Sequence, residues 1–220
     1  MQKLSESHRL FLREAMEKYH ANFPGSAAED YLASRGLNFP SIRQEVDNFK
    51  LGYVADPLPG HEMFRGFLAI PYLRRSESHQ GSVVSIRFRC IEDHEHKGHG
   101  KYMTVAGDRP RLFNTLALLR KSATISITEG ELDAITAQVC GLPAVGVPGA
   151  AAWQPWFREP FLGYREVYIL SDGDDAGMTF ANTVAGTLPN SKIIPMPPGE
   201  DVNSFVQKNT PHALVDRTGK

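Results

Sequence analysis

Short apolar runs separated by helical patterns dominate the second half of the chain. The runs at residues 123–128, 144–147 and 166–171 have the length and the β-branched content of strands buried in a sheet. Apolar residues at the spacing of one helix face predict helices over residues 132–139 and 176–188. Strands and helices in alternation predict a parallel sheet with right-handed crossover connections.

The first half has a different pattern, with helices first and strands after them. Residues 4–19 show the spacing of an amphipathic helix, and Ser26 with Glu29 has the capping-box spacing that begins a second helix. An apolar strand is predicted at residues 67–72. The polar segment 74–81 follows it, and we interpret this segment as an exposed hairpin loop.

Residues 83–91 alternate between two kinds of side chain, as expected for a strand with one buried face. The alternation predicts one face with Val84, Ile86, Phe88 and Cys90 and an opposite face with Ser85, Arg87 and Arg89. Two arginines therefore project from one face of the sheet. Such a pair can be simply solvated, but guanidinium groups also have the shape that binds phosphate with two hydrogen bonds.

Shorter elements complete the expected α/β fold, an α+β N-terminal subdomain followed by a Rossmann-like parallel sheet. We expect a short helix at residues 149–157 with its aromatic side chains in the core, a strand at 193–197 and a helix at 202–208. The residues from Thr210 onward are expected to be frayed. The predicted organisation is an N-terminal helix (1–24), an α+β subdomain with a basic groove (25–121), the parallel-sheet domain (122–209) and a tail (210–220).

Composition and cysteine content narrow the class of protein. The chain of 220 residues has no apolar run long enough to cross a membrane and no signal-peptide pattern, so we expect no membrane contact and a cytoplasmic location. Its two cysteines, Cys90 and Cys140, lack CxxC spacing, which predicts neither a disulfide framework nor a zinc site in this chain.

Charge is unevenly distributed, although the net charge is −1. Residues 65–121 hold 11 basic and 5 acidic side chains, whereas residues 122–220 hold 6 basic and 11 acidic ones. A basic stretch by itself is usually a solvated surface. Next to an acidic segment that gathers a cation, it favours a protein that holds polyanions near that cation.

Three carboxylates follow predicted strands, Glu129 after the first and Asp172 and Asp174 after the third. The carboxyl ends of parallel strands meet at one edge of a sheet, where ligands bind. Carboxylates gathered there repel one another unless a cation joins them, and Mg²⁺ is a hard cation that prefers oxygen ligands. Helix capping explains one or two of them, but it does not explain Glu129. We therefore expect a Mg²⁺ site, with Mn²⁺ as a substitute.

Three segments around these carboxylates resemble the Toprim domain that primases, topoisomerases and some nucleases share. The segments are Thr128–Ala134, Gly146–Ala150 and Ser171–Gly177, and the chain resembles DnaG-type bacterial and phage primases most closely. The resemblance implies that Glu129, Asp172 and Asp174 are catalytic and hold the metal. It also implies that Asp133 and Asp201 are further acidic metal positions.

The segment before the Toprim-like region is similar to the DnaG catalytic core as well. Its matching features are Tyr31-Leu32, Phe49–Tyr53, an arginine that ends a strand, a Lys-Tyr pair and an asparagine. This similarity, with the neighbouring arginine of the same strand face, implies nucleic-acid or nucleotide binding by Arg87, Arg89, Lys101, Tyr102 and Asn114. Asn203 stands where the family usually has Asp, which argues against a second complete metal site.

The implied function is that of a DNA primase catalytic core of a phage or related mobile element. Such an enzyme makes short RNA primers on a single-stranded DNA template from nucleoside triphosphates by Mg²⁺-dependent nucleotidyl transfer. The family usually carries a zinc-binding module, so a separate zinc-binding subunit and a replicative helicase are expected partners. Two alternatives are a Toprim nuclease and a non-catalytic subunit that binds template or nucleotide. A topoisomerase is not expected, because the chain has no room for strand-passing domains.

A histidine-rich stretch at residues 92–100 raises a separate question of metal binding. It contains His94, His96 and His99 among glycines and charged residues. No predicted strand or helix fixes ligand geometry there, so we interpret the stretch as a flexible hairpin tip.

Overall fold

The computed structural model describes residues 4–75 and 81–219, and the chain divides into two compact units at residues 109 and 110. Unit 1 is residues 1–109 and unit 2 is residues 110–220. Residues 110–121, which the sequence analysis grouped with the N-terminal subdomain, are part of unit 2, where Leu112 and Ala117 pack in the core. Most of the predicted exposed loop at 74–81 lies outside the described residues.

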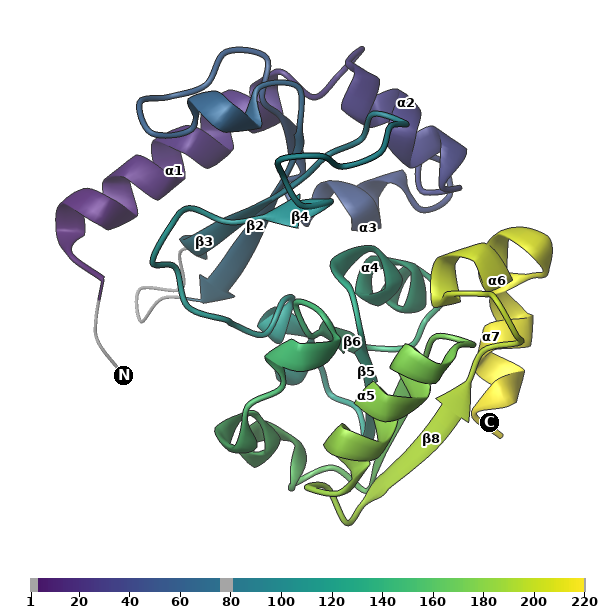
Figure 1. Ribbon diagram of the computed structural model, residues 1–220. Coiled ribbons are helices and arrows are strands. Elements are labelled where there is room, and N and C mark those ends of the chain that lie inside the picture. The colour runs from purple at the N-terminus through teal and green to yellow at the C-terminus, as the bar shows by residue number, and fades with distance from the viewer. Residues whose placement is uncertain (1–3, 76–80, 220) are drawn as a thin grey trace. The chain divides into compact units, whose positions relative to one another are not determined.

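Unit 1 is a four-stranded antiparallel sheet with a long helix packed along it (Figure 1). The strands are paired in the order β1-β2-β3-β4. The elements are α1 (Glu6–Ala21), α2 (Ala27–Ser34), α3 (Arg43–Asp47), β1 (Gly52–Tyr53), η1 (Glu62–Phe64), β2 (Leu68–Arg75), β3 (Gly81–Arg89) and β4 (Tyr102–Met103).

The first helix places its apolar stripe against the sheet, as its sequence pattern predicted. Leu12, Ala15 and Tyr19 are buried in the core of unit 1. A Cβ atom on Gly52 would lie 2.6 Å from the backbone of Tyr19, so the close approach of β1 to α1 requires glycine. The Ser26 side chain caps α2 by accepting a hydrogen bond from the Glu29 amide at 3.4 Å, which confirms the predicted start of that helix.

A β-bulge changes which side chains of β3 face the core. The neighbours Tyr72 and Leu73 of β2 pair with Ser85 and Val83, so that Val84 is left out of the pairing. Val83 therefore packs in the core of unit 1 together with the rest of the predicted face. The predicted core position of Val84 was wrong, because a bulge reverses the alternation on one side of it.

Unit 2 is a parallel four-stranded sheet in the order β6-β5-β7-β8, which confirms the predicted parallel sheet. α4 packs on β5 and β6, and α5 packs on β7 and β8 (Figure 1). The elements are η2 (Thr115–Leu119), β5 (Thr124–Thr128), α4 (Glu131–Val139), β6 (Ala144–Gly146), η3 (Ala150–Ala152), η4 (Pro155–Phe161), β7 (Glu166–Ser171), α5 (Asp175–Ala185), β8 (Ser191–Pro195), α6 (Val202–Lys208) and α7 (Pro211–Arg217).

Two expectations for unit 2 were wrong. The residues after Thr210 are not frayed, because Thr210 caps α7 and Leu214 of that helix is fully buried. The aromatic segment forms two 3₁₀ helices instead of one helix, and Trp156 is 65% exposed while Trp153 and Phe157 pack in the core. In both places the tertiary contacts decide which apolar side chains are covered.

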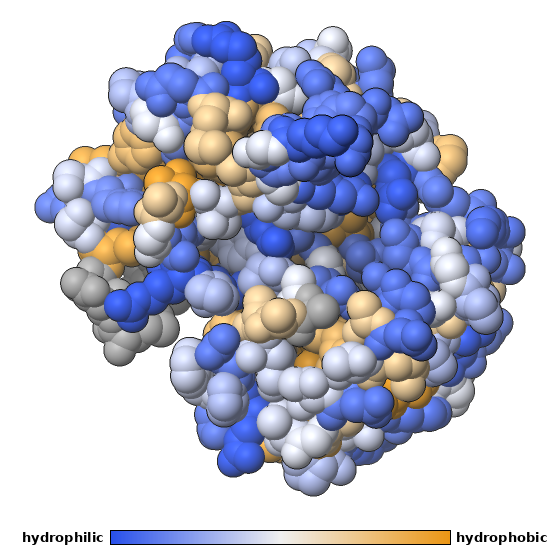
Figure 2. Space-filling model, viewed as in Figure 1, coloured by the Kyte–Doolittle hydropathy of each residue, from blue (hydrophilic) through white to orange (hydrophobic). Residues whose placement is uncertain are grey.

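The surface gives no sign of a membrane-spanning element in the part of the chain that the structure describes. None of its helices has the length and the apolar character needed to cross a bilayer. The face shown in Figure 2 is mostly blue and white, with orange in several separate areas.

Candidate active site

Two carboxylates follow neighbouring strands at the carboxyl edge of the parallel sheet. β5 ends at Thr128 and β7 ends at Ser171, and Thr128 pairs with Leu170 in parallel register. Glu129 and Asp172 are the residues that come directly after these strands, and both are half-buried. The pairing of the two strands therefore brings together side chains that are distant in the chain.

Glycines are required at the turn between β7 and α5 and in the first turn of α5. A Cβ atom on Gly173 would lie 1.9 Å from the carbonyl oxygen of Pro197, and one on Gly177 would lie 2.4 Å from the carbonyl oxygen of Asp172. No side chain fits at such distances. Asp174, between the two glycines, caps α5, since its Oδ1 accepts a hydrogen bond from the Gly177 amide at 2.7 Å.

Asp201 reaches the same edge from a later loop. The amide of Gly173 donates to the carbonyl oxygen of Glu200 at 2.8 Å, and the amide of Gly199 donates to the carbonyl oxygen of Gly173 at 2.9 Å. These bonds hold the loop before α6 against the turn after β7. Asp201 also caps α6 by accepting a hydrogen bond from the Ser204 amide at 2.6 Å.

Asp133 lies in the first turn of α4 and links that helix to α6. Its Oδ1 accepts a hydrogen bond from the amide of Asn203 at 3.1 Å, and the Asn203 side chain donates to the Thr136 hydroxyl at 2.8 Å. Asn203 is therefore buried and links α4 to α6. The resemblance predicted Asp at this position.

Glu131 is a carboxylate that the sequence analysis did not single out. It is the first residue of α4 and only 1% of its surface is exposed. The start of a helix favours negative charge, because the first amide groups of the helix point toward it. The sequence does contain a feature that indicates this position: Glu131 is a second glutamate directly after Glu129-Gly130, at the start of an otherwise apolar helix.

The carboxylates at this edge interact electrostatically, and this interaction changes pKa values. Burial, and then the negative charge of Glu129, raises the pKa of Asp172 to about 7, and Asp201 and Asp174 add to the shift. Burial likewise raises the pKa of Glu129, with contributions from Asp174 and Asp133. The five side chains named in the sequence analysis thus form one cluster of interacting negative charge.

Two oxygens of this cluster are buried without a hydrogen-bond partner, and they are Oε2 of Glu129 and Oδ1 of Asp172. A buried, unpaired carboxylate oxygen costs free energy, and a cation removes that cost. Helix capping accounts for Asp174 and Asp201, but not for these two atoms. An all-oxygen set of this kind fits a hard divalent cation such as Mg²⁺.

Comparison with known proteins places the chain in a family. Residues 126–206 match a family model described as Toprim-like. The Gene 57 protein of Mycobacterium phage D29 is 59% identical over 155 residues, which are 70% of this chain and 99% of that protein. The chain belongs to the family of this gene 57 protein.

Solved structures show that the chain has the fold of DnaG-type primase catalytic cores, and the family model identifies the Toprim-like domain within it. The Aquifex aeolicus primase, with its zinc-binding and RNA polymerase domains, matches with a TM-score of 0.76 and 21% identity over 99% of this chain and 62% of that chain. A DnaG primase catalytic domain bound to single-stranded DNA matches with a TM-score of 0.72 and 19% identity over 98% of this chain and 82% of that chain.

Two arginines of unit 1 are stacked on aromatic rings. Cζ of Arg87 lies 4.7 Å, and Cζ of Arg89 4.6 Å, from the centre of the Tyr102 ring. Arg89 also donates a hydrogen bond to the Tyr102 hydroxyl and lies 5.1 Å from the centre of the Tyr31 ring. Arg89 is 7% exposed and Arg87 is half-buried. Nucleic-acid binding by these side chains stays a prediction.

Lys101 and Asn114, the other two predicted binding residues, differ in exposure. The Lys101 side chain is exposed, as a residue that contacts phosphate must be. Asn114 is buried, and its amide nitrogen donates to Gln138 Oε1 at 2.5 Å and to the Ala144 carbonyl oxygen at 2.7 Å. These bonds give Asn114 a structural role in unit 2, while nucleotide contact by either residue stays a prediction.

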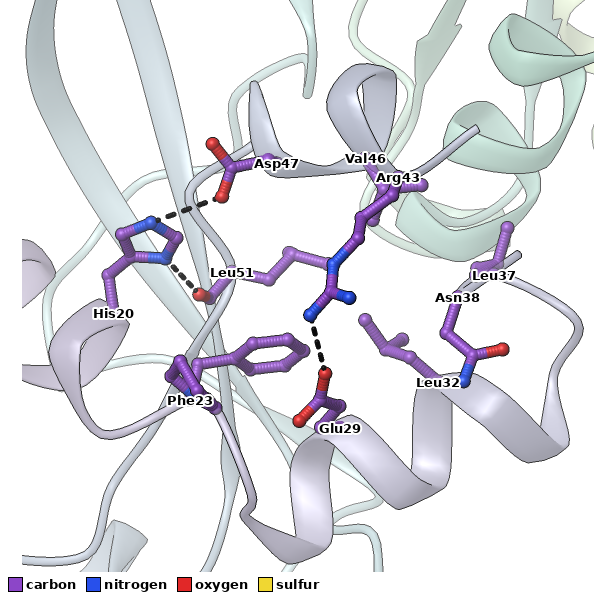
Figure 3. A pocket seen from close by; sticks show the side chains of 11 residues that line it. His20, Phe23, Glu29, Leu32, Leu37, Asn38, Arg43, Val46, Asp47 and Leu51 are labelled. Carbon is purple, nitrogen blue, oxygen red and sulfur yellow. Dashed lines mark hydrogen bonds and ion pairs between the residues drawn. The ribbon is translucent and has the colours of Figure 1, made fainter. Parts of the chain in front are cut away.

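A small pocket of unit 1 lies among α1, α2 and α3 (Figure 3). Arg43 pairs with Glu29 at 3.3 Å, and His20 pairs with Asp47 at 3.4 Å and contacts the Leu51 carbonyl oxygen at 2.7 Å. The pocket has a volume of about 130 Å³, which is well below the size of sites that enclose small molecules. We therefore assign this pocket no nucleotide.

Proposed function

We propose that this chain is the catalytic core of a DNA primase of phage origin, which makes short RNA primers on single-stranded DNA. In this reaction the 3′-hydroxyl of one nucleotide attacks the α-phosphate of an incoming nucleoside triphosphate, and pyrophosphate leaves. The fold and the Toprim-like domain support the class of enzyme. The two unpartnered oxygens of Glu129 and Asp172 are the single observation that supports a catalytic site over a domain that has kept only the fold.

Unit 2 supplies the metal ligands in this proposal. Glu129, Asp172 and Asp174 would hold Mg²⁺, with Asp133 and Asp201 close to it. When bound, Mg²⁺ neutralises charge on the phosphate oxygens and lowers the pKa of the attacking hydroxyl. The caps made by Asp174 and Asp201 fix two of the carboxylates before any substrate binds, so the site needs little rearrangement.

Unit 1 supplies basic side chains for the template and the nucleotide. Arg87 and Lys101 are accessible enough to contact phosphate, whereas Arg89 is enclosed by Tyr31 and Tyr102 and fixes the position of Tyr102. Phosphate contacts provide most of the affinity for nucleic acid. An aromatic ring such as Tyr102 also offers a surface on which a base can stack.

The proposed partners follow from the related primases. The Aquifex structure joins a zinc-binding domain to the RNA polymerase domain, and this chain has no CxxC pattern for such a domain. We propose that a separate polypeptide supplies that module, that a replicative helicase delivers the template, and that the complex acts in the cytoplasm of the host cell.

The decisive experiment is primer synthesis with Asp172→Asn and a matched control. The wild-type chain, alone and with the zinc-binding module of a host primase, receives single-stranded DNA, Mg²⁺ and ribonucleotides. Asp172→Asn is expected to lower primer yield by about 100-fold or more, because it removes a ligand and a negative charge. Asp175→Asn, an exposed carboxylate in the same turn, is expected to retain activity.

The alternatives give different results in the same assays. Magnesium-dependent cleavage of DNA with no primer would identify a Toprim nuclease. DNA binding without either reaction would identify a binding subunit. Equal primer yield from Asp172→Asn and wild type would refute the proposed site.

A further inference from the structure

A cluster of sulfur and nitrogen ligands lies in the loop that connects β3 to β4. One ligand atom from each of Cys90, His94 and His99 lies within 4.8 Å of the other two. Nε2 of His94 is 3.1 Å from Nε2 of His99 and 3.9 Å from Sγ of Cys90. This loop is the histidine-rich stretch that the sequence analysis interpreted as a hairpin tip.

The outer nitrogens of the two histidines have acceptor groups beside them. Nδ1 of His94 lies 3.3 Å from the carboxylate of Glu92, and Nδ1 of His99 lies 3.1 Å from the carbonyl oxygen of Gly100. Both partners can only accept a hydrogen bond, so both Nδ1 atoms carry the proton. Acceptors that hold Nδ1 in this way are the usual support of a histidine that binds metal through Nε2.

This assignment leaves two lone pairs facing each other. With Nδ1 protonated, Nε2 of neutral His94 and Nε2 of neutral His99 are both acceptors, and no proton lies between them. Such an approach is favourable only when a proton or a metal ion lies between the two nitrogens. His96 repeats the pattern, because its Nδ1 contacts the His94 carbonyl oxygen at 2.8 Å and its buried Nε2 has no hydrogen-bond partner.

The spacing of the ligand atoms fits a tetrahedral zinc ion. Zinc bonds of ordinary length place two nitrogens about 3.3 Å apart, and a nitrogen and a sulfur about 3.6 Å apart. The observed 3.1 and 3.9 Å lie on either side of these values. A thiolate with imidazoles is a donor set that selects zinc over Mg²⁺.

The base of the loop is fixed by the sheet and by the core of unit 1. Arg89 pairs with Tyr102 in the sheet, and the amide of Cys90 donates to the Lys101 carbonyl oxygen at 2.9 Å. Cys90 is 4% exposed and belongs to the core of unit 1, and the ring of His99 lies 5.6 Å from that of Phe67. One ligand is therefore rigidly placed, and the histidines reach it from the loop.

We propose that Cys90, His94 and His99 bind one zinc ion. Binding converts the Cys90 thiol to a thiolate and releases its proton to solvent. The ion fixes the loop that separates Arg89 from Lys101, and it adds a net positive charge to the basic segment. The absence of CxxC spacing predicted no zinc in this chain. The proposed site has a single cysteine, and its other two ligands are histidines of the loop.

The test is zinc content and affinity of the untagged full-length chain in excess Mg²⁺. Wild type is expected to hold one zinc ion per chain, and Co²⁺ in its place is expected to show the absorption of a tetrahedral thiolate complex. His99→Ala and Cys90→Ser are each expected to weaken zinc binding by more than about 100-fold. His212→Ala, an exposed histidine of α7, serves as the matched control, and Asp172→Asn excludes binding at the carboxylates.

Each result of the zinc measurements either supports the proposed site or overturns it. Zinc lost in His99→Ala and Cys90→Ser but kept in both controls supports the site. Substoichiometric zinc in wild type, or unchanged affinity in a folded His99→Ala variant, overturns it. Circular dichroism identifies folded variants, and His99→Ala keeps the test valid if loss of the buried Cys90 thiol impairs folding. Because the readout is metal binding, failure of primer synthesis leaves the result unaffected.

Discussion

Asp172 and Asp174 are two residues apart and have different roles. Asp174 uses one oxygen to cap α5, whereas Asp172 has a buried oxygen with no partner. Glu129 resembles Asp172 in this respect. The capped carboxylate stabilises the fold whether or not a cation is present, while the unpartnered ones cost free energy until a cation binds.

This difference predicts how pH and Mg²⁺ act on stability. The pKa of Asp172 is raised to about 7 in the fold, against about 3.9 in an unfolded chain, so the folded state holds an extra proton between these values. Metal-free protein is therefore expected to lose stability as pH rises from about 4 to about 7. Since Mg²⁺ binds the charged form, it is expected to raise the melting temperature more at pH 8 than at pH 5.

Thermal melts of wild type, Asp172→Asn and Asp175→Asn check this prediction. Asp172→Asn is expected to be more stable than wild type at pH 8 without metal and to respond little to Mg²⁺. Asp175→Asn is expected to follow wild type. An equal Mg²⁺ response in Asp172→Asn would contradict the assignment of Asp172 as a ligand.

At the scale of elements, the site depends on how closely two loops approach. The turn from β7 to α5 and the loop before α6 are joined by backbone hydrogen bonds through Gly173, and this contact brings Asp201 to Asp172. Any Cβ at Gly173 would overlap the carbonyl oxygen of Pro197. The loops can approach in this way only because the residue between the two aspartates is glycine.

Gly173→Ala is expected to destabilise the chain by about 3 kcal/mol and to remove Mg²⁺ binding, because the two loops must separate. Gly163→Ala is the matched control, since its Cβ would meet no atom within 4 Å and it is exposed. The control is expected to change stability by less than about 0.5 kcal/mol. Urea unfolding with and without Mg²⁺ measures both effects, and equal stability of the two variants would show that the loops adapt.

At the scale of the whole molecule, the chain separates charge along its length. The basic residues 65–121 contrast with the acidic residues 122–220, and the five clustered carboxylates belong to the acidic part. In the function that we propose, a cation matches the negative charge gathered at the carboxylates, and the basic part attracts the phosphate backbone. Binding of DNA and the reaction itself should therefore respond to different substitutions.

Affinity for single-stranded DNA is expected to fall as salt rises, with a slope set by the number of phosphate contacts. Lys101→Ala is expected to reduce that slope by about 0.7, the contribution of one contact to a single strand. Lys18→Ala, which removes the same charge from α1 outside the basic segment, is expected to leave the slope unchanged. Fluorescence anisotropy over a range of salt concentrations measures it. An unchanged slope in Lys101→Ala would remove this residue from the proposed DNA contacts.

Local patterns determined much of this protein from its sequence. The apolar runs predicted β5 and β7, and the residues directly after them, Glu129 and Asp172, each have a buried oxygen without a hydrogen-bond partner. Strands and helices are encoded by neighbouring residues, and a parallel sheet always gathers the ends of its strands at one edge. Element types and the carboxylate edge could therefore be predicted.

Tertiary structure alone decided the features that depend on contacts between distant residues. The bulge that exchanges Val84 for Val83 arises from the pairing of two strands, and the burial of Leu214 arises from the packing of α7. The meeting of Cys90 with two loop histidines depends on how the chain returns from β3 to β4. Alternation and composition describe one segment at a time, so they carry no information on which segments meet. The sequence therefore determined the strands and the carboxylates that follow them, and the folded chain decided which other side chains reach those places.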